Sequence, residues 1–337
     1  MTTHEHEITE RVELADWRGR LRPEAVGFTR QPRHDAGIPA RWGRRKRWEY
    51  WCVISTRGAL QVTIADLDFV GLVELSFVDF ETKEVASAPF VLPLGAGLAL
   101  PDRSGEPWSV RTPLGSVSLS TGAESTRLQV SARTLWGRID ADLAIATPPS
   151  EESLSVVIPF GDRTYQLTTK RVALPAHGAI RALGRHYAID EAHEGFACLD
   201  FGRGVWPRDT TWNWGTGATR GASGRIGLQL GGKWTDGTRA TENGVFLDGR
   251  LDKIGAELAW QYERSDFSRP WRVRDPHGEI DLTFTPLLER VAKLDLRLIR
   301  TELHLCFGRW SGRVHAHGRD LAIDGALGWA EEHRARW

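Results

Sequence analysis

The sequence predicts an all-β protein made of two antiparallel barrels or strongly curved sheets packed together, with few short helices. From Trp48 onward, short runs rich in Val, Ile, Leu, Phe and Thr are separated by Gly, Pro, Asp and Ser, which is the pattern of antiparallel strands. Within these runs apolar residues alternate with others, as in Leu60, Val62 and Ile64. No stretch of about 12 residues keeps the apolar period of a helix. Closed barrels are favoured because they leave no strand edge unpaired.

The chain divides into three parts by composition. Residues 1–47 are rich in Arg, Pro and Gly without clear periodicity, which predicts an N-terminal arm or cap. Residues 48–150 form an N-terminal β domain, and the stretch TPPSEES at 147–153 is a candidate linker. Residues 151–337 form a C-terminal β domain. Short helices are expected at 177–182, 287–292 and 330–336.

Composition excludes several classes of protein. The formal net charge is zero, whereas a nonspecific nucleic-acid binder needs an excess of Lys and Arg. We expect no nucleic-acid partner. No run of about 18 apolar residues predicts a membrane span, and the polar, acidic N-terminus does not resemble a signal peptide. A cytoplasmic protein is therefore expected. The three cysteines are far apart in sequence, so they predict neither a disulfide framework nor a zinc site.

Tryptophan is unusually frequent in the C-terminal half. The chain has 15 Trp but only 4 Tyr and 1 Met. Trp206, Trp212 and Trp214 lie in one short segment, CLDFGRGVWPRDTTWNWG, that also contains several polar residues. Tryptophan side chains occur both in hydrophobic cores and at binding faces, but tryptophans grouped with acids and amides indicate a ligand site.

That segment supplies the first candidate acid. Asp200 lies between Leu199 and Phe201 and should point to the opposite face of its strand. Arg203 could pair with it and hold the carboxylate ionised. In the run Trp212-Asn213-Trp214, both indoles are expected on one face and Asn213 on the other.

A second carboxylate and amide, Glu242 and Asn243, precede the apolar run Val245-Phe246-Leu247. We interpret Asp200 and Glu242 as candidate catalytic carboxyls, because carboxyls with perturbed pKa values gather at functional sites. The candidate substrate-binding residues are Arg203, Trp206, Trp212, Asn213, Trp214 and Asn243. The alternative is structural: a buried ion pair, and amides that satisfy turn backbone.

The remaining motifs give weaker evidence for a functional site. Glu331 or His333 near the C-terminus could fold back as an acid or base, or lie in solvent. His315 and His317 are two residues apart but have no clear third metal ligand, so we expect no metal. No nucleotide-binding glycine motif stands in a strand–helix context, so we expect no cofactor.

Several ordered motifs resemble the uncharacterised DUF2804 family. These are RWEYWCVI at 47–54, IADLDFVG at 64–71, LDFGRGVWP at 199–207, WNW at 212–214, TENGVFLDG at 241–249, CFGRWSG at 306–312 and GWAEEHRARW at 328–337. More distantly the chain resembles the calycin-type group of carotenoid hydratase-like and tocopherol cyclase-like proteins. That resemblance implies two lipocalin-like barrels and a pocket for a small apolar or amphipathic ligand.

Three functions remain open from the sequence. The first is a cofactor-independent acid–base enzyme, a hydratase, cyclase or isomerase, that acts on a largely apolar or polycyclic substrate in a Trp-lined pocket. The second is a lipocalin-like protein that binds a lipid or isoprenoid. The third is a carbohydrate-active hydrolase with paired carboxylates in an open cleft.

Overall fold

The computed structural model describes residues 3–39, 42–135, 137–296 and 299–336. It is an all-β protein, as predicted, with two large antiparallel sheets and two short 3-10 turns, η1 (Pro23–Ala25) and η2 (Glu191–His193). A small two-stranded sheet near the N-terminus pairs β1 (Val12–Glu13) with β3 (His34–Asp35).

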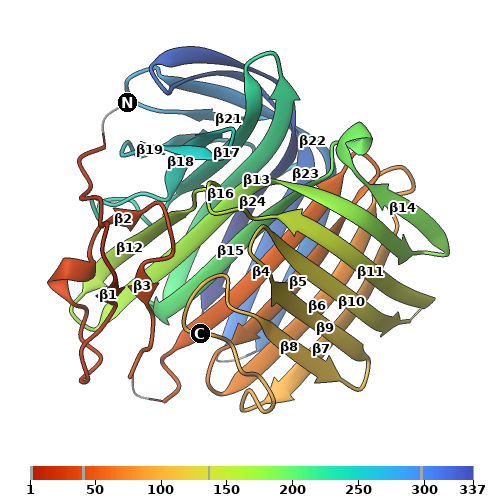
Figure 1. Cartoon of the computed structure of the whole chain (residues 1–337), viewed down its shortest axis with the longest axis horizontal. Helices are drawn as coiled ribbons and strands as arrows, with labels where there is room; N and C mark the ends of the chain where they lie inside the picture. The colour runs from red at the N-terminus through yellow and green to blue at the C-terminus, as the bar shows by residue number, and fades with distance from the viewer. Residues whose placement is uncertain (1–2, 40–41, 136, 297–298, 337) are drawn as a thin grey trace.

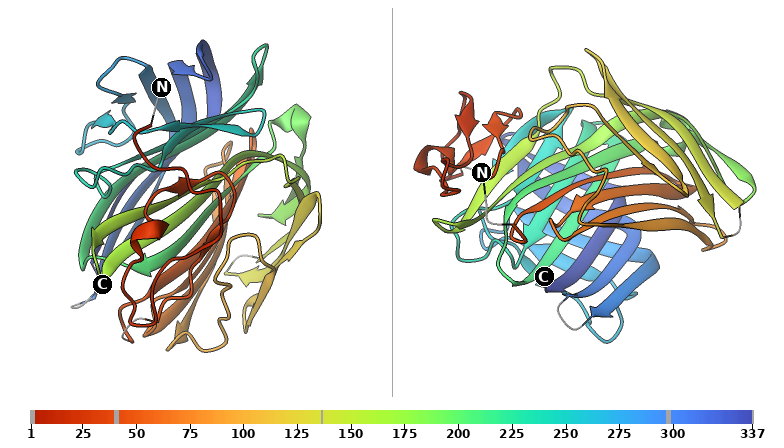
Figure 2. Two further views of the ribbon diagram at one scale, coloured as in Figure 1. Left: turned by 60° about the vertical axis from the view of Figure 1, so that its left-hand side comes forward. Right: turned by 90° about the horizontal axis from the view of Figure 1, so that it is seen from below.

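The first large sheet forms a nearly closed barrel (Figure 1). Its order is β7-β6-β5-β4-β15-β13-β11-β10-β9-β8. In addition, β12 and β14 pair with β13, and β2 pairs with β12. The bounds are β2 (Phe28–Thr29), β4 (Lys46–Ser55), β5 (Gly58–Asp66), β6 (Val70–Asp79), β7 (Val85–Pro93), β8 (Trp108–Thr112), β9 (Gly115–Thr121), β10 (Ser125–Thr134), β11 (Gly137–Ala146), β12 (Leu154–Gly161), β13 (Thr164–Ala182), β14 (Arg185–Ile189) and β15 (Phe196–Val205). Figure 2 shows the yellow strands β8–β11 opposite the orange strands β4–β7.

The second large sheet is a half-barrel. Its order is β19-β18-β17-β16-β24-β23-β22-β21-β20. The bounds are β16 (Asp209–Gly221), β17 (Gly224–Gly232), β18 (Asn243–Leu247), β19 (Arg250–Ile254), β20 (Ala259–Gln261), β21 (Trp271–Arg274), β22 (Ile280–Leu296), β23 (Ile299–Ala316) and β24 (Arg319–Arg336). In the right-hand view of Figure 2, its blue strands lie against the orange strands of the first sheet.

Two expectations about local structure differ from what is observed. The predicted helices at 177–182, 287–292 and 330–336 are parts of the long strands β13, β22 and β24. Each stretch pairs with a neighbouring strand, and this pairing, which the local pattern does not show, decides its structure. The change of sheet falls at 206–208, so β12–β15 belong to the first sheet although they follow residue 150.

Buried apolar side chains form three layers. One fills the first barrel and another lines the concave side of the second sheet. The third lies between the sheets and receives residues from both. We call this layer the seam and define it by Cys52, Val156, Cys198, Trp206, Trp214, Phe307 and Trp329.

Close packing in the seam requires a glycine on β15. A Cβ atom built at Gly202 would lie 2.1 Å from atoms of the Trp48 indole, far inside van der Waals contact. Gly202 therefore lets the indole lie flat across the strand.

We predict that Gly202→Ala lowers the free energy of unfolding by about 1–3 kcal/mol, the usual cost of overpacking a dense interior. Urea unfolding followed by circular dichroism measures it. Gly161→Ala is the matched control, because a Cβ atom there meets nothing within 4 Å. Equal stability of the two variants would contradict the close packing described for Trp48.

Candidate functional site

The candidate site lies in the seam, where charged side chains from both sheets meet. Lys170 on β13 and Asp200 on β15 face each other directly across the two paired strands. Glu242 immediately precedes β18 in the second sheet. The Lys170 Nζ atom lies 3.0 Å from Asp200 Oδ1 and 3.2 Å from Glu242 Oε2. One ammonium group thus joins two carboxyls that are 42 positions apart in sequence.

Neutral donors complete the surroundings of the two carboxyls. Asp200 accepts hydrogen bonds from the Trp48 indole N–H at 3.1 Å and from the Thr168 hydroxyl at 3.1 Å. Glu242 Oε1 accepts the Trp234 indole N–H at 2.6 Å. Within the described part of the chain, Glu242 Oε2 accepts no hydrogen bond of good geometry, although it contacts Lys170. This buried oxygen retains capacity for a further partner.

Burial controls the protonation of the cluster. Burial would by itself lower the pKa of Lys170, but the charges of Asp200 and Glu242 outweigh it and raise that pKa above the ordinary value. Burial raises the pKa of Glu242, and the negative charge of Asp200 adds to the effect. Because Lys170 stays charged and uncompensated buried charge is costly, the arrangement favours one proton on Glu242.

Indoles enclose the cluster. Trp206 and Trp234 stack with ring centroids 5.0 Å apart, and the Lys170 ammonium lies 4.1 Å from the centroid of the Trp214 ring. The Trp206 N–H donates to Gln166 Oε1 and the Trp214 N–H to Gln229 Oε1. The polar edges of both rings are therefore satisfied, while one face of Trp206 is covered by Trp234 and one face of Trp214 by the Lys170 ammonium.

Arg203 does not pair with Asp200, which corrects the expectation from sequence. The two residues are three positions apart on β15, so their side chains leave opposite faces of the strand. Arg203 points into the first barrel and donates to the carbonyls of Pro101, Trp48 and Gly202. Burial lowers the pKa of its guanidinium.

The two candidate asparagines also lie away from the cluster. Asn213 lies on the opposite face of β16 from Trp212 and Trp214, and its Nδ2 donates to the Glu331 carbonyl at 3.0 Å. Asn243 accepts the Gly231 N–H at 2.6 Å and donates to the Ala256 carbonyl at 3.0 Å. Asn243 thereby joins backbone segments and exposes no free amide to the seam.

The residues near the C-terminus are part of the seam as well. Glu331 and His333 lie on β24, beside β16. Trp212 Nε1 donates to Glu331 Oε1 at 2.7 Å, and the Trp212 ring is 4.1 Å from the His333 ring between centroids. Trp212 also contacts Trp206, at 5.7 Å. The indoles therefore connect this part of β24 to the Lys170 cluster.

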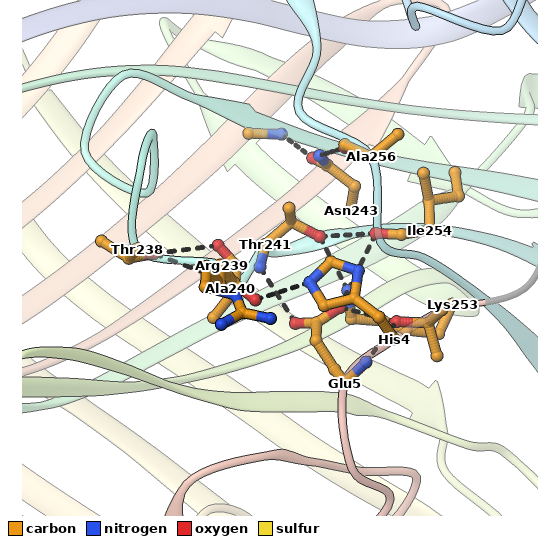
Figure 3. Close-up of polar contacts among 12 residues, drawn as sticks. His4, Glu5, Thr238, Arg239, Ala240, Thr241, Asn243, Lys253, Ile254 and Ala256 are labelled. Carbon is orange, nitrogen blue, oxygen red and sulfur yellow. Dashed lines mark hydrogen bonds and ion pairs between the residues drawn. The ribbon is translucent and has the colours of Figure 1, made fainter.

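The N-terminal arm is attached to the segment that carries Glu242 (Figure 3). Glu5 accepts the Thr241 backbone N–H at 3.0 Å and forms a buried ion pair with Lys253. The His4 ring also bonds the Arg239 carbonyl at 2.8 Å. Burial lowers the pKa of Lys253 to about 8 despite the charge of Glu5. The arm thus restrains the backbone on either side of residue 240.

Two hollows open at opposite ends of β16 and β24. One, of about 430 Å³, is lined by residues such as His177, Phe196 and Arg309. The other, of about 530 Å³, is lined by residues such as Thr211, Thr301 and Arg334. Asp200 and Glu242 line neither hollow and lie in the packed seam between them.

Sequence reasoning missed Lys170, Trp48, Thr168 and Trp234. A weak signal for Lys170 was present, since the lysine lies in the middle of the run TYQLTTKRVAL, which is β-rich on both sides of it. A charged residue in such a position needs a buried partner. Among the residues with described positions, no group of three His, Cys, Asp or Glu could hold a metal ion.

Solved structures with this fold share little sequence with the chain. A protein assigned as AttH from Nitrosomonas europaea aligns with a TM-score of 0.54 at 12% identity, over 86% of this chain and 92% of that one. CghA with Sch210972 aligns with a TM-score of 0.50 at 11% identity, over 87% and 88%. Kievitone hydratase from Nectria haematococca gives 0.45 at 14% identity, over 97% and 98%. At such identities the likeness concerns the fold.

No curated protein matches the chain in sequence. In the described segments, no helix is long and apolar enough to cross a membrane. The family model named "Domain of unknown function (DUF2804)" matches residues 5–337. The match covers the segments of Asp200, Glu242 and β24 together, and it confirms the family indicated by the sequence motifs. The chain belongs to the DUF2804 family.

Proposed function

We propose that the protein is a cofactor-independent acid–base enzyme of the hydratase, cyclase or isomerase type, acting on a largely apolar or polycyclic substrate in the seam. The observation that carries the proposal is the Glu242 carboxyl. It is buried beside Lys170, its Oε1 is held by the Trp234 indole, and its Oε2 has no well-directed hydrogen bond among the described residues.

The charge balance of the cluster makes Glu242 the proton donor. Lys170 compensates one negative charge, and the second carboxyl is neutral when it keeps its proton. A neutral carboxylic acid in an apolar pocket is a general acid that can protonate a carbon–carbon double bond. Asp200 accepts from Trp48, Thr168 and Lys170, which suits the carboxylate of the pair. After proton transfer, Lys170 would stabilise the glutamate that forms.

The indoles are suited to stabilise the cation that protonation of the substrate produces. Protonation of a double bond leaves a cationic centre in the substrate, and indole faces stabilise cations. The Trp214 face already accepts the Lys170 ammonium at 4.1 Å. The stacked pair Trp206 and Trp234 lies beside Glu242. Because Asp200 and Glu242 are buried and line neither hollow, the geometry favours this chemistry over hydrolysis of carbohydrates in an open cleft.

Access is the structural requirement of the proposal. Neither hollow reaches Glu242, so a substrate must displace indoles of the seam. The contacts from Trp212 through Trp206 to Trp234 lead from the hollow near Thr211 toward Glu242. Rotation of these three rings would open the route. The structure of CghA with Sch210972 has a similar fold, which supports a bound organic molecule in such a scaffold.

We predict that the protein transfers solvent deuterons to carbon. It is incubated in D2O with a panel of apolar alkenes and polycyclic enones, and deuterium incorporation is measured by mass spectrometry. Hydration, cyclisation and isomerisation by protonation all leave a deuteron on carbon. Glu242→Gln should lower the rate by about 10²- to 10⁴-fold, the usual contribution of a general acid, and Asp200→Asn should also reduce it.

Glu124→Gln is the control, because Glu124 is exposed on the first barrel. Undiminished incorporation in both Glu242→Gln and Asp200→Asn would refute the assignment. A tightly bound apolar molecule seen by native mass spectrometry, without deuteration of any panel member, would favour the lipid-binding function instead.

Stability should depend on pH through Glu242. Its pKa is raised in the folded protein from the ordinary 4.5, so the folded state binds more protons than the unfolded state just above that pH. The free energy of unfolding should therefore fall as pH rises from 4.5 to the raised pKa, by at most about 1.4 kcal/mol per pH unit. Urea unfolding of wild type and Glu242→Gln across this range measures the difference. The same pH slope in both proteins would contradict a raised pKa.

A further inference from the structure

The hollow of about 530 Å³ lies beside a hydroxyl that is hydrogen bonded to an imidazole. Thr301 on β23 lines the hollow. Its Oγ1 lies 2.6 Å from His333 Nε2 on β24. On the far side of the ring, His333 Nδ1 lies 3.6 Å from Glu331 Oε1. Hydroxyl, imidazole and carboxylate thus follow one another in the order of a nucleophile, its general base and an orienting acid.

The surrounding strands hold this order in place. Glu331 and His333 are two positions apart on β24 and leave the same face, toward the seam. Trp212 donates to Glu331 Oε1 at 2.7 Å and packs its ring on the imidazole. Glu331 is buried and His333 is half-buried, whereas Thr301 reaches the hollow. Glu331 is therefore the most shielded of the three, while His333 and Thr301 are both half-buried.

The neighbouring charges select the tautomer. Nδ1 lies within ion-pair distance of the Glu331 carboxylate but beyond hydrogen-bond distance, and the negative charge favours the tautomer with its proton on Nδ1. The lone pair of Nε2 then faces Thr301 and accepts the hydroxyl hydrogen. This is the direction of proton transfer that activates a hydroxyl nucleophile.

The lining of the hollow fits a substrate that develops negative charge. Lys293, Arg300, Arg334 and Arg336 line it, together with the acids Asp209, Asp295 and Glu302. Arg300 and Lys293 hold exposed ion pairs with Asp295 and Glu302. Such pairs contribute little stability, so both cations can exchange a partner for a ligand oxygen.

We propose that Thr301 is the nucleophile of an acyl-transfer site for small carboxylic esters, with His333 as its general base and Glu331 as a positioning residue. Thr301 Oγ1 bonds to the ester carbonyl carbon as His333 Nε2 takes its proton. The tetrahedral intermediate then expels the alkoxide, which leaves as alcohol with that proton. Water attacks the acyl-threonine by the same route, releasing the carboxylic acid and restoring the hydroxyl.

This site is separate from Glu242, so the two proposals can fail independently. The probe is p-nitrophenyl acetate added to the full-length protein. We expect a burst of p-nitrophenolate and one acetyl group on Thr301, located by peptide mass spectrometry. Thr301→Val should abolish both, Thr301→Ser should restore them, and His333→Gln should slow the burst by about 10²-fold or more. Glu124→Gln, at an exposed position of the first barrel, should react like wild type.

The role of Glu331 is tested by a conservative rescue. Glu331→Gln keeps an amide oxygen for Trp212 but removes the charge beside His333, so it should slow the burst, whereas Glu331→Asp, which restores the charge, should recover part of the rate. Circular dichroism and urea unfolding of each variant show that it is folded. Acetylation that avoids Thr301 in wild type, or that survives unchanged in folded Thr301→Val, would overturn the proposal.

Discussion

The ammonium group of Lys170 is the contact on which the arrangement of the seam depends. It comes from the first sheet, lies within ion-pair distance of Asp200 on the next strand, and reaches Glu242 of the second sheet. A buried charge is tolerated only with a partner, so each of the three groups requires the other two. This mutual requirement joins the two sheets in a layer that also contains indole packing and directed contacts such as those of Arg290 with Gln61 and Ser76.

The same layer contains two different environments for titratable side chains. In its middle, dry packing and the positive charge of Lys170 favour a neutral acid at Glu242. Toward the end of β24, the seam meets the hollow lined by Thr301, whose hydroxyl contacts His333. The proposed proton donor therefore lies in the more buried of the two places.

Much of the architecture follows from local pattern. Alternation and turn residues are read correctly as antiparallel strands, because the side-chain period of two and the chemistry of Gly and Pro act over a few residues. The stretches 177–182, 287–292 and 330–336 were expected as helices and are strand. They lie in the longest strands, where pairing with neighbouring strands, which is not visible in the local pattern, decides the structure.

By itself the sequence determined the class of fold, the family, and the two segments that bring Asp200 and Glu242 together. Only the tertiary structure decided which neighbours these acids have. Arg203, three residues from Asp200, leaves the opposite face of β15, while Lys170, 30 positions earlier in the chain, is its direct cross-strand partner. The physical reason is that strand register and sheet pairing, which set side-chain neighbours at the ångström level, depend on contacts between distant parts of the chain.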